Sequence, residues 1–433
     1  MASVQVTRSE IDGVIRCPSS KSYTHRAIAI GSLAERQSVI TNILLARDTL
    51  ATLNACRSLG ANIIHKNSTL WIEGKSKFDT PENVINAENS GTTIRLLTVM
   101  SALVDKGFTV LTGDESLRKR PMQPLLDALQ QLGVECHSTQ MNGTPPLIVR
   151  GGGIEGGAAV VDGTVSSQFI SALLISSIYA ARDITLKVTG AQVSAPYIDA
   201  TLAIMKAFGV TIKQKTKYSE YFIENNEYKP TIFDIPADLS TAALIIAAGV
   251  LAGRRLTIQG INFFLPQADS YIIEIVKTMG GRIKVDKRKA EIIIQGARNL
   301  SGGSFDLTNS PDLLPVVSIL ALKSNKTVRI TGVSHARLKE TDRVSNIAFE
   351  LAKFGASIKE QRDEISITAP TTIKNASLEA YNDHRLFMAF TIASMLTEKS
   401  TVSGAESVDV SYPNFIQDMV KLGAHIKPIV QRE

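Results

Sequence analysis

The sequence of 433 residues contains few of the residues that build disulfide frameworks and metal sites. Its three cysteines, Cys17, Cys56 and Cys136, are odd in number and scattered along the chain. They fit a reducing compartment and show neither a disulfide framework nor the spacing of a zinc site. The six histidines show no ligand spacing either. We therefore expect a cytoplasmic protein that uses no metal and no cofactor.

Long apolar runs and aromatic clusters are also missing. No stretch of about 18 unbroken apolar residues is present, so the sequence predicts no membrane span. The opening MASVQVTRSEIDG lacks the apolar region of a secretory signal. Aromatic residues make up 6% of the chain and no basic stripe is interleaved with them, which disfavours nucleic-acid binding. The net charge of +6 fits either a solvated surface or a cleft for anions, depending on where the basic residues lie.

Repetition is the strongest feature that the sequence does have. Six segments end a helical pattern in a glycine and continue directly into a strand pattern. A fixed period, here roughly 70 to 75 residues, indicates one supersecondary unit used repeatedly. Glycine suits this position because a helix C-cap needs a left-handed residue. The six glycines are Gly60, Gly133, Gly209, Gly280, Gly355 and Gly423.

The rest of the repeated unit predicts the fold. Each copy opens with small polar residues and continues through an apolar helix, a β-rich run, a second helix, the glycine and, in most copies, two short strands. We interpret the unit as β-α-β-α-β-β, with its first helix buried because that helix is apolar on nearly every face. A chain of this length is too long for one core, so we expect two α/β domains of three units each.

No linker rich in Pro, Gly or Ser marks the domain boundary. We place the boundary by two prolines, Pro18 and Pro236, that precede the polar openings of two units. Residues 2–16 are predicted to form a strand pair that completes the last unit. The chain then crosses twice between the domains, through short segments suited to a hinge. The expected domains are residues 17–236 and residues 237–433 together with 1–16.

Candidate functional residues lie where single copies depart from the shared pattern, at the polar openings before the buried helices. Such openings present free backbone N–H groups and the positive end of a helix dipole, which together bind anions. Lys21 and Arg26 surround one helix start, and Arg120 precedes Pro121 at another. Cations are disfavoured at a helix N-terminus unless a bound anion compensates. Solvated cations beside ordinary capping residues are the simpler alternative.

Small polar residues mark further openings. Gly91 would let a ligand approach the backbone closely. Ser166, Ser167 and Ser194 combine hydroxyl groups with backbone amides, a combination that suits a phosphate group. A tight turn or a capping box explains each of these residues equally well when it is taken alone.

The fifth and sixth copies add groups that can transfer protons. Asp312 precedes a buried helix, and the segment HARLKETDR holds Lys339, Glu340 and Arg343. NDHR in the sixth copy adds His384, which can titrate near neutral pH, beside a guanidinium group. A surface charge network is the alternative explanation. Taken together, the openings describe a binder of two small polyanions that moves protons between them.

Eight motifs at these openings run from residue 18 to residue 385: PSSKSYTHR, NSGTTIR, RPMQPLLDALQQLG, SSQF, SAPYID, SPDLLP, RLKETDR and YNDHR. In type and order they resemble the motifs of the 5-enolpyruvylshikimate-3-phosphate synthase family, the shikimate-pathway transferases that glyphosate inhibits. KETDR and YNDHR together are highly specific for that family. The resemblance implies two domains, each of three units around a pseudo-threefold axis (an inverse α/β barrel), with the active site in the cleft between them.

The resemblance also implies a reaction and the residues that serve it. A hydroxyl of shikimate 3-phosphate adds to the central carbon of phosphoenolpyruvate, the methylene gains a proton, and the tetrahedral intermediate loses phosphate. Asp312 is the implied proton acceptor, Glu340 protonates the methylene, and Lys21 and His384 are further catalytic candidates. The implied shikimate 3-phosphate contacts are Lys21, Ser22, Arg26, Ser166, Ser167, Gln168, Ser194, Tyr197, Asp312 and Lys339. The implied phosphoenolpyruvate contacts are Lys21, Gly91, Arg120, Gln168, Arg343 and Arg385.

Three positions depart from the family pattern. His335 replaces an asparagine, Val410 stands where many members carry a lysine, and Leu96 replaces a common proline. A sister enzyme that moves enolpyruvate to a UDP-amino sugar is one alternative, but it typically carries a cysteine in the loop before Arg120, and GDESLRKR has none. An RNA-binding or RNA-end-processing protein and a non-catalytic scaffold are the others. We expect a monomer that binds neither nucleic acid nor membranes.

Overall fold

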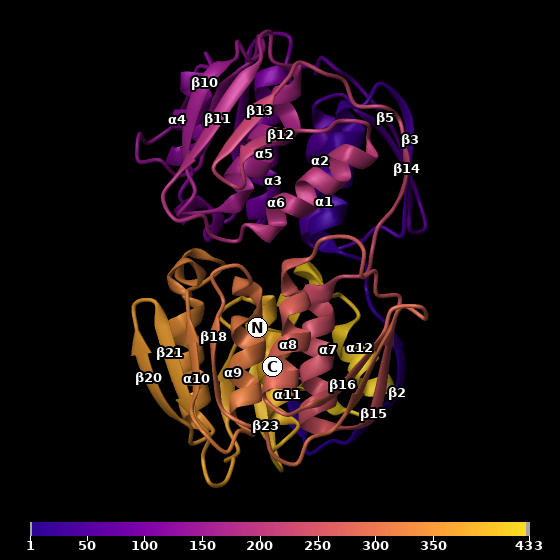
Figure 1. The fold of residues 1–433 in the computed structure, drawn as a ribbon, viewed down its shortest axis with the longest axis vertical. Coiled ribbons are helices and arrows are strands. Elements are labelled where there is room, and N and C mark those ends of the chain that lie inside the picture. The colour runs from indigo at the N-terminus through magenta and orange to yellow at the C-terminus, as the bar shows by residue number, and fades with distance from the viewer. Residues whose placement is uncertain (1, 430–433) are drawn as a thin grey trace. The chain divides into compact units, whose positions relative to one another are not determined.

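The computed structural model of the chain describes residues 2–429. These residues divide into two compact units (Figure 1). One unit is Ser19–Pro236, and the other comprises the chain up to Pro18 together with Ala237 onward; we call the second one the split unit. Among the described residues, each unit contains three four-stranded sheets and six α-helices.

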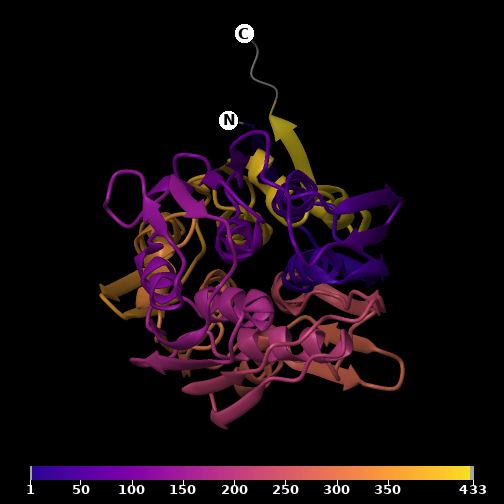
Figure 2. The same cartoon turned by 90° about the horizontal axis from the view of Figure 1, so that it is seen from above.

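In the unit Ser19–Pro236 the strands lie toward the rim and the helices nearer the middle (Figure 2). Its three sheets, in strand order, are β14(Ile232–Asp234)-β3(Arg36–Thr41)-β5(Thr69–Gly74)-β4(Asn62–Lys66), β6(Ile85–Asn86)-β7(Phe108–Thr112)-β9(Leu147–Arg150)-β8(Cys136–Ser138) and β10(Gly157–Asp162)-β11(Ile184–Thr189)-β13(Glu220–Ile223)-β12(Lys213–Thr216). Its helices are α1(Lys21–Leu33), α2(Arg47–Ser58), α3(Gly91–Met100), α4(Gln123–Gln131), α5(Ser167–Ser176) and α6(Pro196–Ala207).

The split unit has the same composition. Its sheets are β16(Arg282–Asp286)-β17(Glu291–Gln295)-β15(Gly253–Gln259)-β2(Ile11–Arg16), β18(Gly303–Asp306)-β19(Val328–Thr331)-β21(Glu364–Thr368)-β20(Ser357–Gln361) and β22(Ser377–Glu379)-β23(Ser400–Ser403)-β1(Ser3–Thr7)-β24(His425–Ile429). Its helices are α7(Leu239–Ala252), α8(Ile272–Thr278), α9(Leu314–Ala321), α10(Arg343–Lys353), α11(His384–Ser394) and α12(Phe415–Lys421).

The pairing within each sheet reproduces the predicted β-α-β-α-β-β unit. In the second of the six repeats, for example, β6 runs parallel to β7, and β9 runs antiparallel to both β7 and β8. Helix α3 connects the two parallel strands, as a crossover connection between parallel strands requires. The other five sheets show the same order of one parallel and two antiparallel pairings.

The N-terminal strands do not pair with each other, so that part of the prediction is wrong. As predicted, β1 completes the sheet of the last unit, where it pairs with β23 and β24. Strand β2, however, runs parallel to β15, the strand that follows α7 in the chain. Strand β14, just before α7 in the chain, likewise joins β3 in the first sheet. Every other sheet takes its parallel strand from the segment that precedes its first helix. At the two crossings these strands are exchanged: β14 precedes α7 and joins β3, whereas β2 precedes α1 and joins β15.

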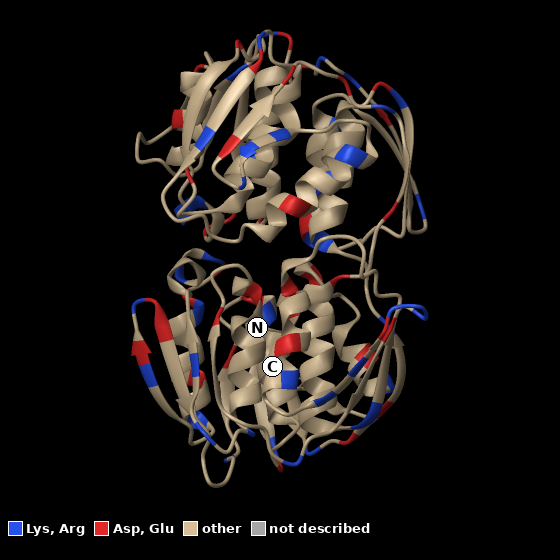
Figure 3. Ribbon diagram, viewed as in Figure 1, with Lys and Arg blue, Asp and Glu red and all other residues tan. Residues whose placement is uncertain are grey.

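The first helix of each of the six repeats is largely buried, as its apolar sequence predicted. Helix α7 is buried at every residue except Ala252. Helices α5, α7 and α9 carry no charged residue, and Figure 3 shows the charged residues mainly on strands, loops and the other helices. The six repeat glycines all have left-handed backbone conformations, with φ between +79° and +106°. An L side chain there would strain the backbone, which explains why glycine closes each second helix.

Candidate active site

Helix α1 begins with a cation beside an acid. Ser20 caps the helix by accepting a hydrogen bond from the amide of Tyr23, and Lys21 is the first helical residue. Lys21 Nζ lies 2.8 Å from Asp48 Oδ2 in the first turn of α2. The other oxygen, Asp48 Oδ1, is buried and has no hydrogen-bond partner within residues 2–429. The pair therefore fixes the ammonium group at the opening of the first unit.

Arg26 is a buried cation held by neutral groups. Its guanidinium donates to Thr201 Oγ1 at 2.7 Å, to the carbonyl of Ser22 at 2.9 Å and to the carbonyl of Tyr197 at 3.2 Å. Burial lowers the pKa of Arg26 to about 10, so the group remains charged at neutral pH. In the described part of the chain no carboxylate forms an ion pair with it. A buried charge of this kind is costly unless an anion joins it.

The starts of α3 and α5 are linked by side chains. Arg95 donates hydrogen bonds to Gln168 Oε1 and Ser166 Oγ, and Gln168 Nε2 donates to Thr92 Oγ1 at 3.0 Å. Ser166 is the N-cap of α5 and accepts from the amide of Gln168. Ser194 adopts a left-handed φ of +55° just before α6. The structure thus brings the predicted serine and glutamine residues to helix starts, where Ser166 and Gln168 are half-buried and Ser167 and Ser194 are buried.

Arg120 is a second buried cation without an acidic partner. Its side chain donates to Asn89 Oδ1 at 2.9 Å and Ser116 Oγ at 3.3 Å, and Arg120 is only 7% exposed. Among residues 2–429 it makes no ion pair, and its Nε has no hydrogen-bond partner. A Cβ atom on Gly91 would lie 3.1 Å from Arg120 Nη1. Gly91 therefore leaves space between a guanidinium and the N-terminus of α3, as an anion site requires.

The split unit holds a cluster built on one arginine. Arg343, the first residue of α10, is 1% exposed. Its guanidinium lies 2.9 Å from Asp312, 2.7 Å from Glu340 and 2.7 Å from Asp383. One cation therefore holds three carboxylates, two of which the sequence predicted as the proton acceptor and the proton donor. We call these four residues the Arg343 cluster.

Arg385 extends this cluster to the start of α11. Its Nη2 lies 2.9 Å from Asp312 Oδ2, so two guanidinium groups share the Asp312 carboxylate. Burial alone would raise the pKa of Asp312, but the neighbouring cations, Arg385 first among them, outweigh burial and hold it well below its usual range. Asp312 is therefore ionised at neutral pH.

Three further residues of interest in the split unit lie at the start of α11 or in 3₁₀ turns. His384 is the first residue of α11 and is buried. His335 lies in the 3₁₀ turn Ser334–Leu338, where burial, assisted by Lys339, lowers its pKa to about 4 and keeps it neutral. Val410 is buried in the 3₁₀ turn Ala405–Val410. Val410 therefore contributes a buried apolar side chain and no charge.

Comparison with known proteins decides the family. The sequence model of the family described as "EPSP synthase (3-phosphoshikimate 1-carboxyvinyltransferase)" matches residues 6–419. The chain belongs to the EPSP synthase family. A Nitrosopumilus maritimus protein named 3-phosphoshikimate 1-carboxyvinyltransferase is 46% identical over 424 residues, which cover 98% of this chain and 99% of that protein. A Methanocaldococcus jannaschii protein of the same name is 43% identical over 419 residues, covering 96% and 97%.

Solved structures agree with this assignment to the EPSP synthase family. The EPSP synthase of Acinetobacter baumannii matches with a TM-score of 0.83 and 26% identity, covering 99% of this chain and all of that one. The enolpyruvyl transferase NikO of Streptomyces tendae matches with a TM-score of 0.81 at 17% identity, covering 100% and 99%, which supports the fold alone. The predicted α/β enolpyruvyl-transferase fold of two three-unit bodies is confirmed.

Three residues in these clusters were not among the predicted site residues, although the motifs NAENSGTTIR and NDHR contain two of them, Asn89 and Asp383. Asp383 was noted only as part of NDHR, yet it pairs with Arg343 and caps α11. Asp48 holds Lys21, and Asn89 holds Arg120. Asp383 could have been identified as an N-cap before an apolar helix. The partners of Asp48 and Asn89 lie 27 and 31 residues away in the chain, and no local pattern marks such contacts.

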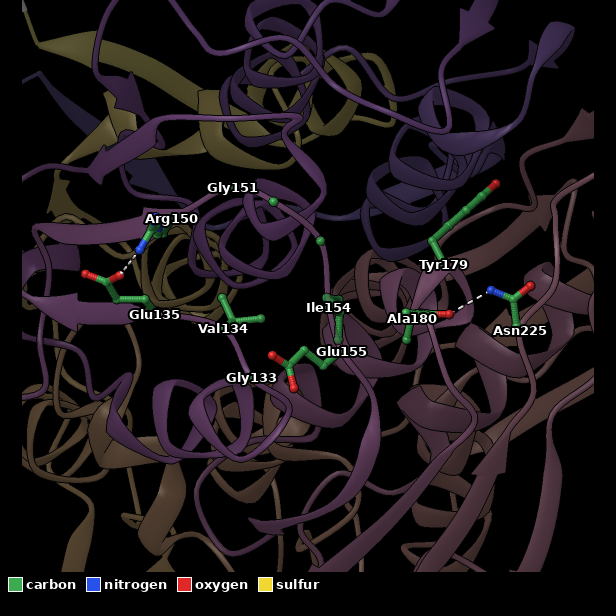
Figure 4. A pocket seen from close by; sticks show the side chains of 13 residues that line it. Gly133, Val134, Glu135, Arg150, Gly151, Ile154, Glu155, Tyr179, Ala180 and Asn225 are labelled. Atoms are coloured by element: carbon green, nitrogen blue, oxygen red, sulfur yellow. Dashed lines mark hydrogen bonds and ion pairs between the residues drawn. The ribbon is translucent and has the colours of Figure 1, made fainter.

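One pocket of the unit Ser19–Pro236 is lined by none of the residues predicted to bind the substrates (Figure 4). It has a volume of about 560 Å³ and lies beside the glycine-rich turn 151–153. Its Arg150 pairs with Glu135 at 2.8 Å, and Asn225 donates to the carbonyl of Ala180 at 2.7 Å. Because the cation among its lining residues is already paired, this pocket does not suit a phosphorylated substrate.

Within residues 2–429, no group of three or more His, Cys, Asp or Glu side chains could hold a metal ion. Across the same range, no helix combines the length and the apolar character that a membrane span requires.

Proposed function

We propose that the chain catalyses the reaction for which the EPSP synthase family is named. It transfers the enolpyruvyl group of phosphoenolpyruvate to the 5-hydroxyl of shikimate 3-phosphate and releases phosphate. The observation that carries the proposal is the Arg343 cluster, in which one buried guanidinium holds the carboxylates of Asp312 and Glu340. This arrangement supplies two proton-transfer groups and a positive charge without a nucleophilic side chain.

The buried cations of the unit Ser19–Pro236 support the choice of substrates. Arg26 lies beside hydroxyl-bearing residues and suits the phosphate of shikimate 3-phosphate, with Ser22 and Tyr197 already in contact with its guanidinium. Arg120 and Gly91 suit phosphoenolpyruvate. The other proposed contacts with the two substrates are Lys21, Ser166, Ser167, Gln168, Ser194, Lys339, Arg343 and Arg385. We propose that the clusters of both units act on the same substrate pair and that the units close on it.

The proposed reaction has two proton-transfer steps. Asp312 accepts the proton of the attacking hydroxyl, whose oxygen bonds to the central carbon of phosphoenolpyruvate, while Glu340 protonates the methylene carbon. The tetrahedral intermediate then returns a methyl proton to the Glu340 carboxylate and expels phosphate, which takes the proton held by Asp312. This elimination forms the enol ether and returns both side chains to their starting states. The side chains supply position and charge stabilisation, which lower the barrier most when they are fixed in advance.

The low pKa of Asp312 makes this step depend on substrate binding. A carboxylate with so low a pKa is a weak base. Substrate anions that bind Arg385, Arg343 and Lys339 neutralise the charges that hold this pKa down. The pKa of Asp312 then rises, and the carboxylate becomes a stronger base only when both substrates are in place.

Replacing Arg120 with alanine should raise the KM for phosphoenolpyruvate sharply. The loss of one charge-assisted contact should cost about 2–4 kcal/mol of transition-state stabilisation, measured as kcat/KM. The control is Lys119→Ala, because Lys119 is an exposed neighbour that forms only a surface pair with Glu115. Kinetics of Arg120→Ala that match those of the Lys119 variant would remove Arg120 from the site.

The choice of acceptor separates the proposed function from that of the sister enzyme. The protein is incubated with phosphoenolpyruvate and either shikimate 3-phosphate or a UDP-amino sugar, and the products are identified by mass spectrometry. We expect the carboxyvinyl adduct of shikimate 3-phosphate only. An adduct of the UDP-amino sugar alone would assign the chain to the other reaction.

We also propose that the protein acts as a cytoplasmic monomer. One chain supplies a residue for every implied substrate contact, and its three cysteines are free and buried, which suits a reducing compartment. Analytical ultracentrifugation with and without both substrates tests the monomer, and a concentration-dependent dimer would contradict it.

A further inference from the structure

Glu350 is a fully buried carboxylate that no step of the proposed reaction uses. It lies on α10 and accepts hydrogen bonds from three donors. Both of its oxygens lie 2.8 Å from Lys353 Nζ, Oε1 lies 2.8 Å from the hydroxyl of Tyr381, and Oε2 lies 3.1 Å from the amide of Glu379. Two of these donors belong to the segment Glu379–Asp383, which includes the first three residues of YNDHR.

Glu350 and Arg343 hold that segment from the same helix. Glu350 follows Arg343 by seven residues on α10, about two helical turns, so both side chains lie on one face. Arg343 binds the segment through Asp383 at 2.7 Å. Glu350 binds it through Tyr381 and the Glu379 amide. The chain from Glu379 to Asp383 is therefore fixed to α10 at both ends.

The fixed segment has an unfavourable backbone conformation. Tyr381 and Asn382 both adopt left-handed φ angles, +52° and +56°. Residues other than glycine rarely adopt this conformation, and two in succession persist only where the surrounding contacts hold them. Asn382 tolerates it better than Tyr381, because asparagine is common in this region. The hydrogen bond from Tyr381 to Glu350 holds the less tolerant of the two.

The turn determines where α11 begins. Immediately after it, Asp383 caps the helix, with Oδ1 accepting from the amide of Arg385 at 2.8 Å. The side chain of Arg385 then reaches Asp312 at 2.9 Å. A displacement of the turn would move the Asp383 cap and the Arg385 guanidinium together, away from Asp312.

We infer that Glu350 is a positioning residue that acts through Tyr381 to place Arg385 for the anionic substrate. The inference rests on the proposed function, in which Arg385 binds phosphoenolpyruvate. Glu350 itself contacts no reacting atom. It holds the left-handed turn, and the turn places the start of α11.

The test begins with Tyr381→Phe, which removes one hydroxyl and keeps the ring. The matched control is Tyr228→Phe, because Tyr228 is a tyrosine whose hydroxyl likewise donates one hydrogen bond, to the carbonyl of Ile175 at 2.8 Å in the other unit. We expect Tyr381→Phe to raise the KM for phosphoenolpyruvate about tenfold, with the KM for shikimate 3-phosphate changed less than about twofold. Tyr228→Phe should change neither KM.

A double-mutant cycle tests the connection to Glu350. If Glu350 acts through Tyr381, Glu350→Gln combined with Tyr381→Phe should raise the KM for phosphoenolpyruvate no further than Glu350→Gln alone. Additive increases would overturn the connection. If Glu350→Gln does not fold, Tyr381→Phe still decides, because kinetics equal to those of Tyr228→Phe would overturn the inference.

Hydrogen exchange tests the same inference without turnover. The amides of Arg385 and Leu386 are bonded to Asp383, so a displaced turn should make them exchange faster in Tyr381→Phe than in wild type and in Tyr228→Phe. Unchanged exchange would contradict the positioning role. A wild-type protein that releases no phosphate would instead overturn the proposed function, so the two failures are distinguishable.

Discussion

Asp312→Asn is expected to lower turnover by about 100-fold or more while shikimate 3-phosphate still binds, as the loss of a general base does. Asparagine keeps the shape of the side chain and one acceptor oxygen but cannot take the proton of the attacking hydroxyl. Steady-state kinetics measure the first effect, and calorimetric titration with shikimate 3-phosphate measures the second.

Asp312 is ionised at the pH at which Asp312→Asn is compared with the wild-type protein. The pKa of Asp312 lies below the value of about 3.9 expected in an unfolded chain. Its ion pairs therefore stabilise the fold at neutral pH and are lost only as the pH falls below that value. At pH 7 the variant is compared with a fully ionised wild type.

The control for Asp312→Asn is Asp363→Asn. Asp363 is an exposed carboxylate of the split unit that accepts from the amide of Ser334, so its variant removes one charge away from the Arg343 cluster. If Asp312→Asn loses binding together with turnover, Asp312 has a structural role. If its turnover stays within a few-fold of wild type, the proton is accepted elsewhere, with Lys21, Glu340 and His384 the next candidates.

Arg343→Ala is expected to lower the free energy of unfolding by about 3–5 kcal/mol, because it removes the partner of buried carboxylates. Asp383, the most buried of them, is 0% exposed and loses its guanidinium partner. The same substitution should abolish measurable turnover, since Asp312 and Glu340 lose their common anchor. Urea unfolding at pH 7 measures the stability change.

Arg329→Ala provides the comparison for this prediction. Arg329 pairs with Glu364 on the surface, with the arginine side chain 56% exposed, and such pairs contribute about 1 kcal/mol or less. Lowering the pH should reduce the deficit of Arg343→Ala, because the crowded carboxylates then become protonated and repel less. A deficit for Arg343→Ala equal to that of the Arg329 variant would show that the Arg343 cluster is not a structural centre.

Most of the repeated architecture could be predicted because local rules specify it. Each left-handed glycine ends its helix for a reason contained in a few neighbouring residues, and the apolar first helices indicate their own burial. The partner of strand β2 could not be predicted. Its sequence, IDGVIR, carries no mark of its partner, and its neighbour β15 lies more than 230 residues further along the chain.

The candidate site, too, has features that the sequence predicts and features that it does not. Charged motifs such as KETDR stand out because their residue types are unfavourable where they occur unless a ligand or partner compensates. The sequence does not show which cations stay unpaired: Arg343 holds three carboxylates, whereas Arg120 has none among residues 2–429. Glu350 was missed because its helix position looks like an ordinary surface position, and only the fold buries it.

Phosphate release tests the proposed reaction most directly. The purified protein is incubated with phosphoenolpyruvate alone, with shikimate 3-phosphate alone and with both, and inorganic phosphate is followed over time. We predict phosphate release only when both substrates are present, in an amount equal to the carboxyvinyl adduct formed. Release from either substrate alone, or none with both, would contradict the account.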